Sequence, residues 1–186
     1  MPTTIVDVRP LVGQYSIDPT HTDVGFVARH LMISKVRGRF GGVSGRIDIA
    51  DPVEHSSVTV RIDAGSIDTG TADRDAHLRS PDFFDVEQYP TIEFKSTAVR
   101  GTSDSTLDVE GDLTIRGVTK QVTLGATYEG FGPSPFGDER IGLSAVAELD
   151  REDWGLTWNA AMETGGVVVG KRVKLEIEVE AIRASG

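Results

Sequence analysis

Cysteine is absent from the 186-residue sequence, and its absence excludes several classes of protein. Without it there is no disulfide framework, no thiolate metal site and no cysteine nucleophile. Long hydrophobic runs are also missing, so no segment has the length of a membrane span. The N-terminal stretch MPTTIVDVRPLVG lacks a basic region followed by a long apolar run. It therefore shows no secretory signal, and we expect a cytoplasmic location.

Positive charge is scarce, because 19 Lys and Arg stand against 29 Asp and Glu, which gives a net charge of −10. This balance argues against nucleic acid and against an anionic membrane surface as electrostatic partners. The four histidines lie far apart in the sequence, and no pair has the spacing of a metal site. We expect neither a metal nor a cofactor.

The length fits one domain with a substantial core. We predict a flexible or loosely docked lead-in over residues 1–13 and a single domain over residues 14–186. Apolar and polar residues alternate through most of this domain, as they do in β-strands. In residues 22–30, one face carries apolar side chains and a histidine: Val24, Phe26, Ala28 and His30.

The apolar phase slips by one residue at Gly41-Gly42, which predicts a β-bulge or a sharp bend there. Eight or nine such strands, mostly in hairpin succession, predict a closed antiparallel barrel, because closure removes free edges and the exposed apolar face. An eight-stranded barrel can hold one small ligand. The inward faces include the small residues Gly38, Ala98, Gly111, Ala126 and Ala145. These residues either relieve crowding or leave room for a ligand, and spacing alone leaves both explanations open.

One segment, residues 66–90, departs from the alternation and is dense in charge before it turns apolar. Thr71 is placed to cap a short helix. Ser80-Pro81-Asp82 has the features of a second helix start: a serine cap, a proline at the first helical position and an acid in the first turn. We therefore predict a compact helical insert in an otherwise all-β chain.

Four stretches of the chain together resemble the YceI-like family, whose members have a lipocalin-like shape and have been described as polyisoprenoid-binding. These stretches are DPTHTDVGFVARHL (18–31), SIDTGTADRDAHLRSPDFFDVEQYPTIEFKST (66–97), GDLTIRGVTKQVTL (111–124) and REDWGL (151–156). The similarity runs from about Gln14 to Ile182. It implies an extended eight-stranded antiparallel lipocalin-like barrel with a short helical insert, an apolar tunnel that holds a long lipid, and homodimers among some members.

The sequence departs from the family in two respects. Trp154 stands where the family more often has Phe, and a tryptophan there would reshape the mouth of the tunnel. Many relatives carry an export signal and this sequence shows none, so a periplasmic location does not transfer.

We predict that the barrel binds a long-chain isoprenoid-type lipid, such as a polyprenyl or an isoprenoid quinone, for carriage or storage and without catalysis. Each buried CH₂ group contributes about 0.8 kcal/mol, so a long chain needs no specific polar contact to bind. The alternatives are a binder of fatty acids or fatty amides, and an enzyme that acts on an amphiphile.

The predicted ligand-binding residues are apolar or aromatic, apart from one histidine: Phe26, His30, Phe40, Phe83, Phe84, Phe94, Leu113, Leu143, Trp154 and Trp158. The aromatic residues are equally consistent with a plain core. His30 lies on an apolar face, where it must find either a partner within the protein or a polar atom of the ligand.

The charged insert offers three candidates for a polar head group, Arg74, His77 and Arg79, because arginine binds phosphate in a bidentate manner. The simpler explanation is that Asp75 and the arginines tie the insert to neighbouring strands, and we favour it. Ser80, His77 and Asp75 are close in sequence, but neighbours in a chain do not make a catalytic triad.

Overall fold

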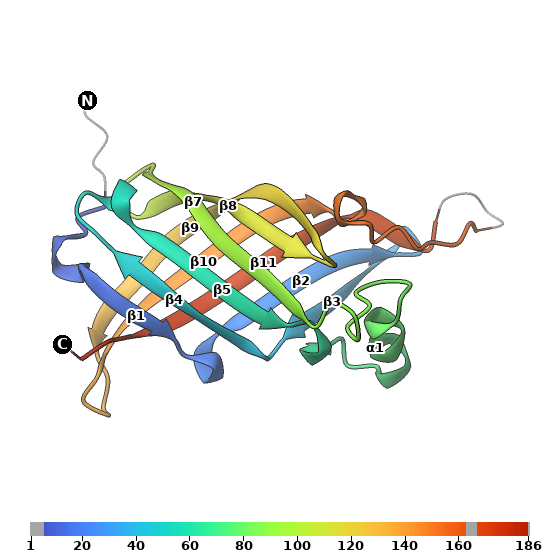
Figure 1. Cartoon of the computed structure of the whole chain (residues 1–186), viewed down its shortest axis with the longest axis horizontal. Helices are drawn as coiled ribbons and strands as arrows, with labels where there is room; N and C mark the ends of the chain where they lie inside the picture. Colours follow the sequence, from blue (N-terminus) through green and yellow to red (C-terminus); the bar gives the residue numbers. More distant parts are fainter. Residues whose placement is uncertain (1–5, 163–166, 186) are drawn as a thin grey trace.

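A computed structural model describes residues 6–162 and 167–185 of the chain. The described residues form one antiparallel sheet and one short α-helix (Figure 1). The strands are β1 (Gly13–Ile17), β2 (Asp23–His30), β3 (Ser34–Phe40), β4 (Val43–Ile49), β5 (Ser57–Asp63), β6 (Ile67–Asp68), β7 (Thr91–Gly101), β8 (Thr106–Ile115), β9 (Val118–Pro133), β10 (Glu139–Asp150) and β11 (Val169–Arg183). The helix is α1 (Ala72–Arg79).

The sheet closes because β11 uses two partners on the same side. Its C-terminal part pairs with β1 through Ala181–Arg183, and its earlier part pairs with β2. The strands β1 and β2 therefore act together as one long interrupted strand of the barrel. The pair β3 and β4 forms a second such strand, and the pair β5 and β6 forms a third. The result is the predicted eight-stranded closed antiparallel barrel, in which each long strand neighbours the next one in the sequence.

The predicted bend at Gly41-Gly42 is confirmed, because β3 ends at Phe40 and β4 begins at Val43. Both of these flanking side chains are buried although they are three positions apart, an odd spacing that would place them on opposite faces of a regular strand, and this is the phase slip seen in the sequence. A Cβ atom on Gly42 would lie 2.8 Å from Cβ of Asp63, so the bend needs glycine at this position.

The insert contains one helix, and its predicted second start at Ser80 is wrong. Thr71 is the N-cap residue of α1, as expected, although its hydroxyl makes no capping hydrogen bond. Ser80 is the C-cap instead, and its N–H and hydroxyl both donate to the carbonyl of His77, at 3.1 and 2.6 Å. A residue that precedes a proline is restricted to extended backbone. Ser80 meets this restriction as a C-cap residue, with ψ of 169°, so the Ser-Pro pair is as compatible with a helix end as with a helix start.

Part of the segment predicted as a lead-in packs on the barrel. Val6 and Val8 are buried against Val53 and Val99, and Leu11 belongs to the main core. The carbonyl of Leu11 accepts a hydrogen bond from the Tyr15 hydroxyl at 2.7 Å. The remainder of the lead-in, residues 1–5, lies outside the described residues.

The prediction that Ala98 belongs to the inward face of its strand is also wrong. The pairing of β7 with β8 shifts by one residue between Ser96 and Ala98, so the next side chain, Val99, is buried instead. A bulge of this kind reverses the faces of a strand beyond it.

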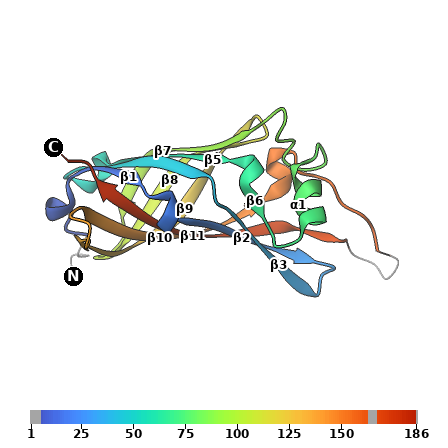
Figure 2. The same cartoon turned by 90° about the horizontal axis from the view of Figure 1, so that it is seen from below.

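The two ends of the barrel differ. The helix α1, the 3₁₀-helix η5 (Arg151–Trp154) and the tip of the β2–β3 hairpin lie at one end, and the C-terminal end of β11 lies at the other (Figures 1 and 2). We call the end that carries α1 the α1 end. Within the described residues, no helix is both long and apolar enough to cross a membrane.

Candidate functional site: an apolar cavity along the barrel

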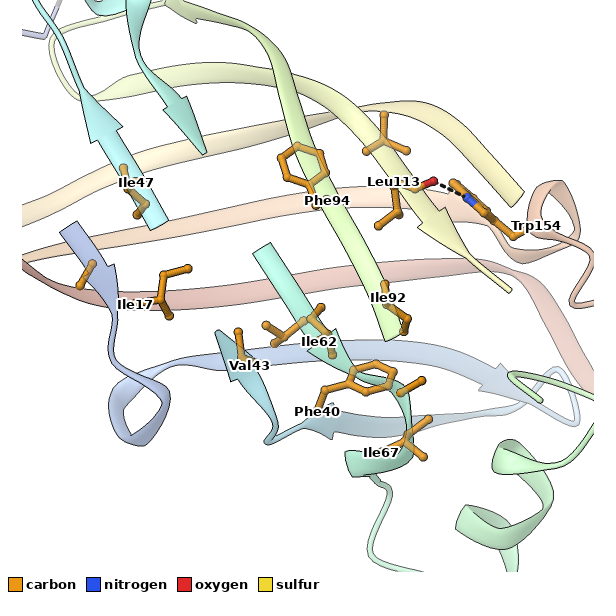
Figure 3. Close-up of a cluster of buried hydrophobic side chains, with 14 of the residues drawn as sticks. Ile17, Phe40, Val43, Ile47, Ile62, Ile67, Ile92, Phe94, Leu113 and Trp154 are labelled. Atoms are coloured by element: carbon orange, nitrogen blue, oxygen red, sulfur yellow. Dashed lines mark hydrogen bonds between the residues drawn. The ribbon is translucent and has the colours of Figure 1, made fainter. Parts of the chain in front are cut away.

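A continuous cavity of about 260 Å³ runs through the interior of the barrel, and side chains from all eight long strands line it. At the α1 end the lining also includes Leu78 of α1 and Leu156, which follows η5. Figure 3 shows how side chains from several strands point into the shared interior. Eight of the predicted ligand-binding residues belong to this lining: Phe26, Phe40, Phe83, Phe84, Phe94, Leu113, Leu143 and Trp154.

The two other predicted residues lie elsewhere among the described residues. His30 ends β2, where it pairs with Ser34 and with Val169 of the cavity lining, but it does not itself line the cavity. The ring of Trp158 packs behind the lining, with its centroid 4.6 Å from that of His77 and 5.5 Å from that of Phe83. Trp158 therefore supports the wall at the α1 end from outside.

The small inward residues divide between the two explanations that the sequence left open. A Cβ atom on Gly38 would lie 2.3 Å from the ring of Phe26, and one on Gly111 would lie 2.4 Å from the ring of Phe94. These glycines therefore make room for phenyl rings of the protein itself. Ala126 and Ala145 line the cavity, so their small size leaves space in it.

Trp154 fixes the wall at the α1 end. Its side chain is 3% exposed, and its indole N–H donates to the carbonyl of Leu113 at 2.9 Å (Figure 3). A buried indole N–H needs such a partner, and here a strand of the barrel provides it. The apolar part of the ring is thereby held against the cavity.

The charged residues of α1 make contacts within the insert. Asp75 is buried and accepts hydrogen bonds from the N–H and hydroxyl of Thr69, at 2.9 and 2.6 Å. Burial acts to raise the pKa of Asp75, but these hydrogen bonds and the charges of Arg79 and Arg74 together outweigh it, so the pKa lies below its ordinary value. Arg74 donates to the hydroxyl and carbonyl of Thr69, at 2.7 and 2.9 Å.

Arg79 and His77, the other two head-group candidates, also have partners in the protein. Arg79 donates to the carbonyls of Gly65 and Ile67, at 2.9 and 3.0 Å, which ties α1 to the segment before it. The Nε2 atom of His77 lies 2.9 Å from Oδ2 of Asp82. These contacts favour the structural explanation of the insert.

Arg151 is a charged residue of the cavity lining that the sequence reasoning missed. It is 7% exposed, and it donates to the carbonyls of Leu156, Trp158, Gly170 and Val169, at 2.6, 3.0, 3.0 and 3.3 Å. The sequence places it in an irregular stretch with acidic neighbours, which looks like an exposed loop.

The positive charge of Arg151 has no carboxylate within ion-pair distance among the described residues. Its neighbour Glu152 pairs with Lys171 instead, at 3.1 Å. Burial lowers the pKa of the Arg151 guanidinium, and the ring of Phe83 lies 5.9 Å from its central carbon. The apolar cavity therefore has one cationic group in the described part of its wall, near the α1 end.

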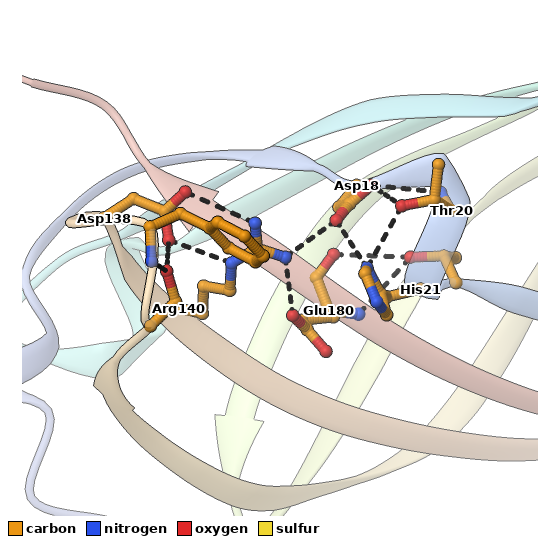
Figure 4. Close-up of polar contacts among 9 residues, drawn as sticks. Asp18, Thr20, His21, Asp138, Arg140 and Glu180 are labelled. Atoms are coloured by element: carbon orange, nitrogen blue, oxygen red, sulfur yellow. Dashed lines mark hydrogen bonds and ion pairs between the residues drawn. The ribbon is translucent and has the colours of Figure 1, made fainter.

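A second polar cluster surrounds Arg140 (Figure 4). Its guanidinium lies 2.8 Å from Asp18, 2.9 Å from Asp138 and 2.7 Å from Glu180. Hydrogen bonds from His21, Thr20 and Arg140 lower the pKa of Asp18 despite its burial. Asp18, His21 and Glu180 are close enough together to hold a metal ion, but Arg140 already supplies their positive charge, so the cluster is an ion-pair network.

Comparison with known proteins shows the family of this chain. The YceI-like domain matches residues 15–181. A UPF0312 protein of Pseudomonas putida is 37% identical over 179 residues, which cover 94% of this chain and 89% of that protein. The chain therefore belongs to the YceI-like family, as its sequence motifs predicted.

Two solved structures share the fold. BcnA of Burkholderia cenocepacia superposes with a TM-score of 0.78 at 21% identity, covering 88% of this chain and 98% of BcnA. A polyisoprenoid binding domain from Saccharophagus degradans superposes with a TM-score of 0.67 at 20% identity, covering 91% and 98%.

Proposed function

We propose that this protein binds a long-chain isoprenoid-type lipid, a polyprenyl or an isoprenoid quinone, and carries or stores it without catalysis. The observation that carries the proposal is the continuous apolar cavity lined from every long strand of the barrel. The shared fold with a polyisoprenoid binding domain supports the same class of ligand.

Burial of hydrocarbon is sufficient to drive binding. Association costs about 4–15 kcal/mol, and on the order of twenty buried CH₂ groups at about 0.8 kcal/mol each offset the upper end of that range. The cavity volume of about 260 Å³ lies just below the usual range of small-molecule pockets, roughly 300–1,000 Å³. The slender chain of a polyprenyl, or the tail of a quinone, suits this volume better than the quinone ring itself. A tail of about twenty CH₂ groups requires side chains of the lining to move.

Arg151 favours a second candidate ligand, a fatty acid or a fatty amide. A carboxylate or amide oxygen near the α1 end would meet a buried guanidinium that lacks an anionic partner among the described residues. A neutral polyprenyl chain makes no use of this charge, so the identity of the bound molecule separates the two candidates.

The third candidate, an enzyme, has less support. The Ser80 hydroxyl donates to the main-chain carbonyl of His77, and the His77 ring faces Asp82. Asp75 accepts from Thr69. These three residues therefore lack the mutual contacts of a nucleophile, a base and an orienting acid. A homodimer and a cytoplasmic location stay predictions.

The test is solvent extraction of freshly purified protein, followed by mass spectrometry of the extract. We expect polyprenyl or quinone species from the wild type. The Phe26→Glu variant should yield at least about tenfold less lipid, because a charge that faces the cavity lacks a partner there. Val146→Glu is the matched control, since Val146 is exposed on β10.

Melting of each variant shows whether it folds, and Leu143→Asn replaces Phe26→Glu if that variant does not. Full lipid retention by a folded Phe26→Glu or Leu143→Asn variant contradicts the proposed site. Recovery of fatty acids or amides alone supports the second candidate, and turnover of an added amphiphile supports the third.

A further inference from the structure

The tip of the β2–β3 hairpin exposes apolar side chains. Three residues, Leu31, Met32 and Ile33, connect the paired ends of the two strands, His30 and Ser34. Met32 is 52% exposed and Ile33 is 80% exposed. A short hairpin loop normally carries polar or small residues, so this composition calls for an explanation.

The backbone of the tip makes its composition more unusual. Leu31 and Met32 have φ angles of 54° and 62°, in the left-handed region that Asn, Asp or Gly adopts most readily. This backbone costs stability at leucine and methionine, and Met32, which is half exposed, gains little from burial inside the protein. An apolar partner outside the chain would supply that gain.

Four basic residues cover the outward face of the same hairpin, and all four are exposed: Arg29, Lys35, Arg37 and Arg39. Residues 23–40 contain these four cations and one acid, so the hairpin carries a net charge of +3 in a chain of −10. Arg29 and Lys35 stand directly opposite each other across the two strands, where like charges destabilise the pairing.

The two cations nearest the tip are unneutralised. Arg37 pairs with Glu176 at 3.3 Å and Arg39 stands opposite Asp68 of β6, whereas Arg29 and Lys35 have no ion-pair partner within the described part of the chain. An apolar tip beside unpaired cations is the composition of segments that dock on anionic lipid, because the tip enters the headgroup boundary and the cations bind the surface charge.

We propose that the β2–β3 hairpin docks this protein on the surface of an anionic lipid bilayer. The net charge of the whole chain argued against such a surface, but the charge is unevenly distributed and the hairpin presents the opposite sign. Nucleic acid fits less well, since a Met-Ile tip offers no ring for base stacking.

The position of the hairpin gives the docking a direction. The hairpin projects at the α1 end, below the helix and away from it in the view of Figure 2. Arg151 and Trp154 of the cavity wall lie at this same end. Docking therefore turns the α1 end of the barrel toward the bilayer, where a lipid ligand would enter or leave if the proposed function holds.

Flotation of the full chain with vesicles tests the proposal. We expect the protein to float with phosphatidylcholine vesicles that contain phosphatidylserine, and far less with pure phosphatidylcholine. Binding should weaken as salt is raised, because exposed charges are screened. Replacing Arg29 and Lys35 together with alanine should weaken binding roughly 25-fold, at about fivefold for each cation.

The apolar part of the tip is tested with the double variant Met32→Ser, Ile33→Ser, which should reduce flotation without lowering the melting temperature. The matched controls are Phe136→Ser, an 81% exposed residue of the β9–β10 hairpin, and Lys95→Ala, an exposed cation on β7. Both controls should bind vesicles as the wild type does.

Three results would overturn the proposal: no flotation of the wild type with anionic vesicles, full flotation of the hairpin variants, or equal loss in the controls. A change of oligomeric state in the tip variants with unchanged flotation would instead assign the tip to contacts between copies. Lipid extraction from the same samples tests the proposed function independently of docking. The outward hairpin residues do not line the cavity, so their substitution should leave the bound lipid unchanged.

Discussion

The guanidinium of Arg151 joins two parts of the chain that the sequence separates. Two of its carbonyl acceptors, Leu156 and Trp158, follow η5, and the other two, Val169 and Gly170, begin β11. Its fork of N–H donors reaches all four, which a lysine ammonium with three donors on a flexible stem does not reproduce. One side chain therefore fixes both the wall of the cavity and the start of a barrel strand.

Arg151→Lys should lower the free energy of unfolding by about 2–4 kcal/mol, because it keeps a buried charge while removing hydrogen bonds that satisfy it. Equilibrium unfolding in urea of the lipid-free protein measures this change. Arg46→Lys is the matched control, since Arg46 is exposed and its ion pair is with Asp48, and we expect a change within about 0.5 kcal/mol there. Equal stability of the two variants would mean that the four carbonyls are satisfied without Arg151.

At the scale of elements, the alternation of apolar and polar residues is sufficient to predict the strands, the bend at Gly41-Gly42 and the face to which most residues belong. It fails where a local shift changes the phase without a glycine signal, as at Ser96 in β7. It also fails at Ser80, because a serine before a proline suits a helix end as well as a helix start. The buried role of Arg151 depends on carbonyls from distant residues, which no local pattern reveals.

The insert has a structural role that can be separated from ligand choice. Arg79 donates to the carbonyls of Gly65 and Ile67, so Arg79→Ala leaves both without this partner and frees α1 from the segment before it. We expect a loss of about 1–3 kcal/mol in unfolding free energy and an unchanged lipid profile by mass spectrometry. Arg61→Ala is a control for an exposed arginine on β5. A changed lipid profile with unaltered melting would assign Arg79 to the head group.

At the scale of the whole molecule, parts of the barrel interior are filled by the protein's own side chains and other parts are open. Phenyl rings occupy the space above Gly38 and Gly111, whereas Ala126 and Ala145 face the cavity. Closure through β1 and β11 hides the strand edges at one end, and the β2–β3 hairpin extends past the closed part at the other. The same sheet thus supplies an apolar cavity and a surface of opposite charge to the rest of the chain.

A matched pair of substitutions compares an open part of the barrel interior with a filled part. Ala126→Leu adds atoms to the cavity, so the lipid-free protein should melt at the same or a higher temperature while less lipid, or shorter chains, are extracted from it. Gly111→Ala places a Cβ atom 2.6 Å from the carbonyl oxygen of Lys95 as well as against Phe94, and it should cost about 1–3 kcal/mol of stability. Calorimetry and mass spectrometry on the same samples measure both effects. If Ala126→Leu destabilises the protein as much as Gly111→Ala does, the interior has no spare room and the cavity is not a lipid site.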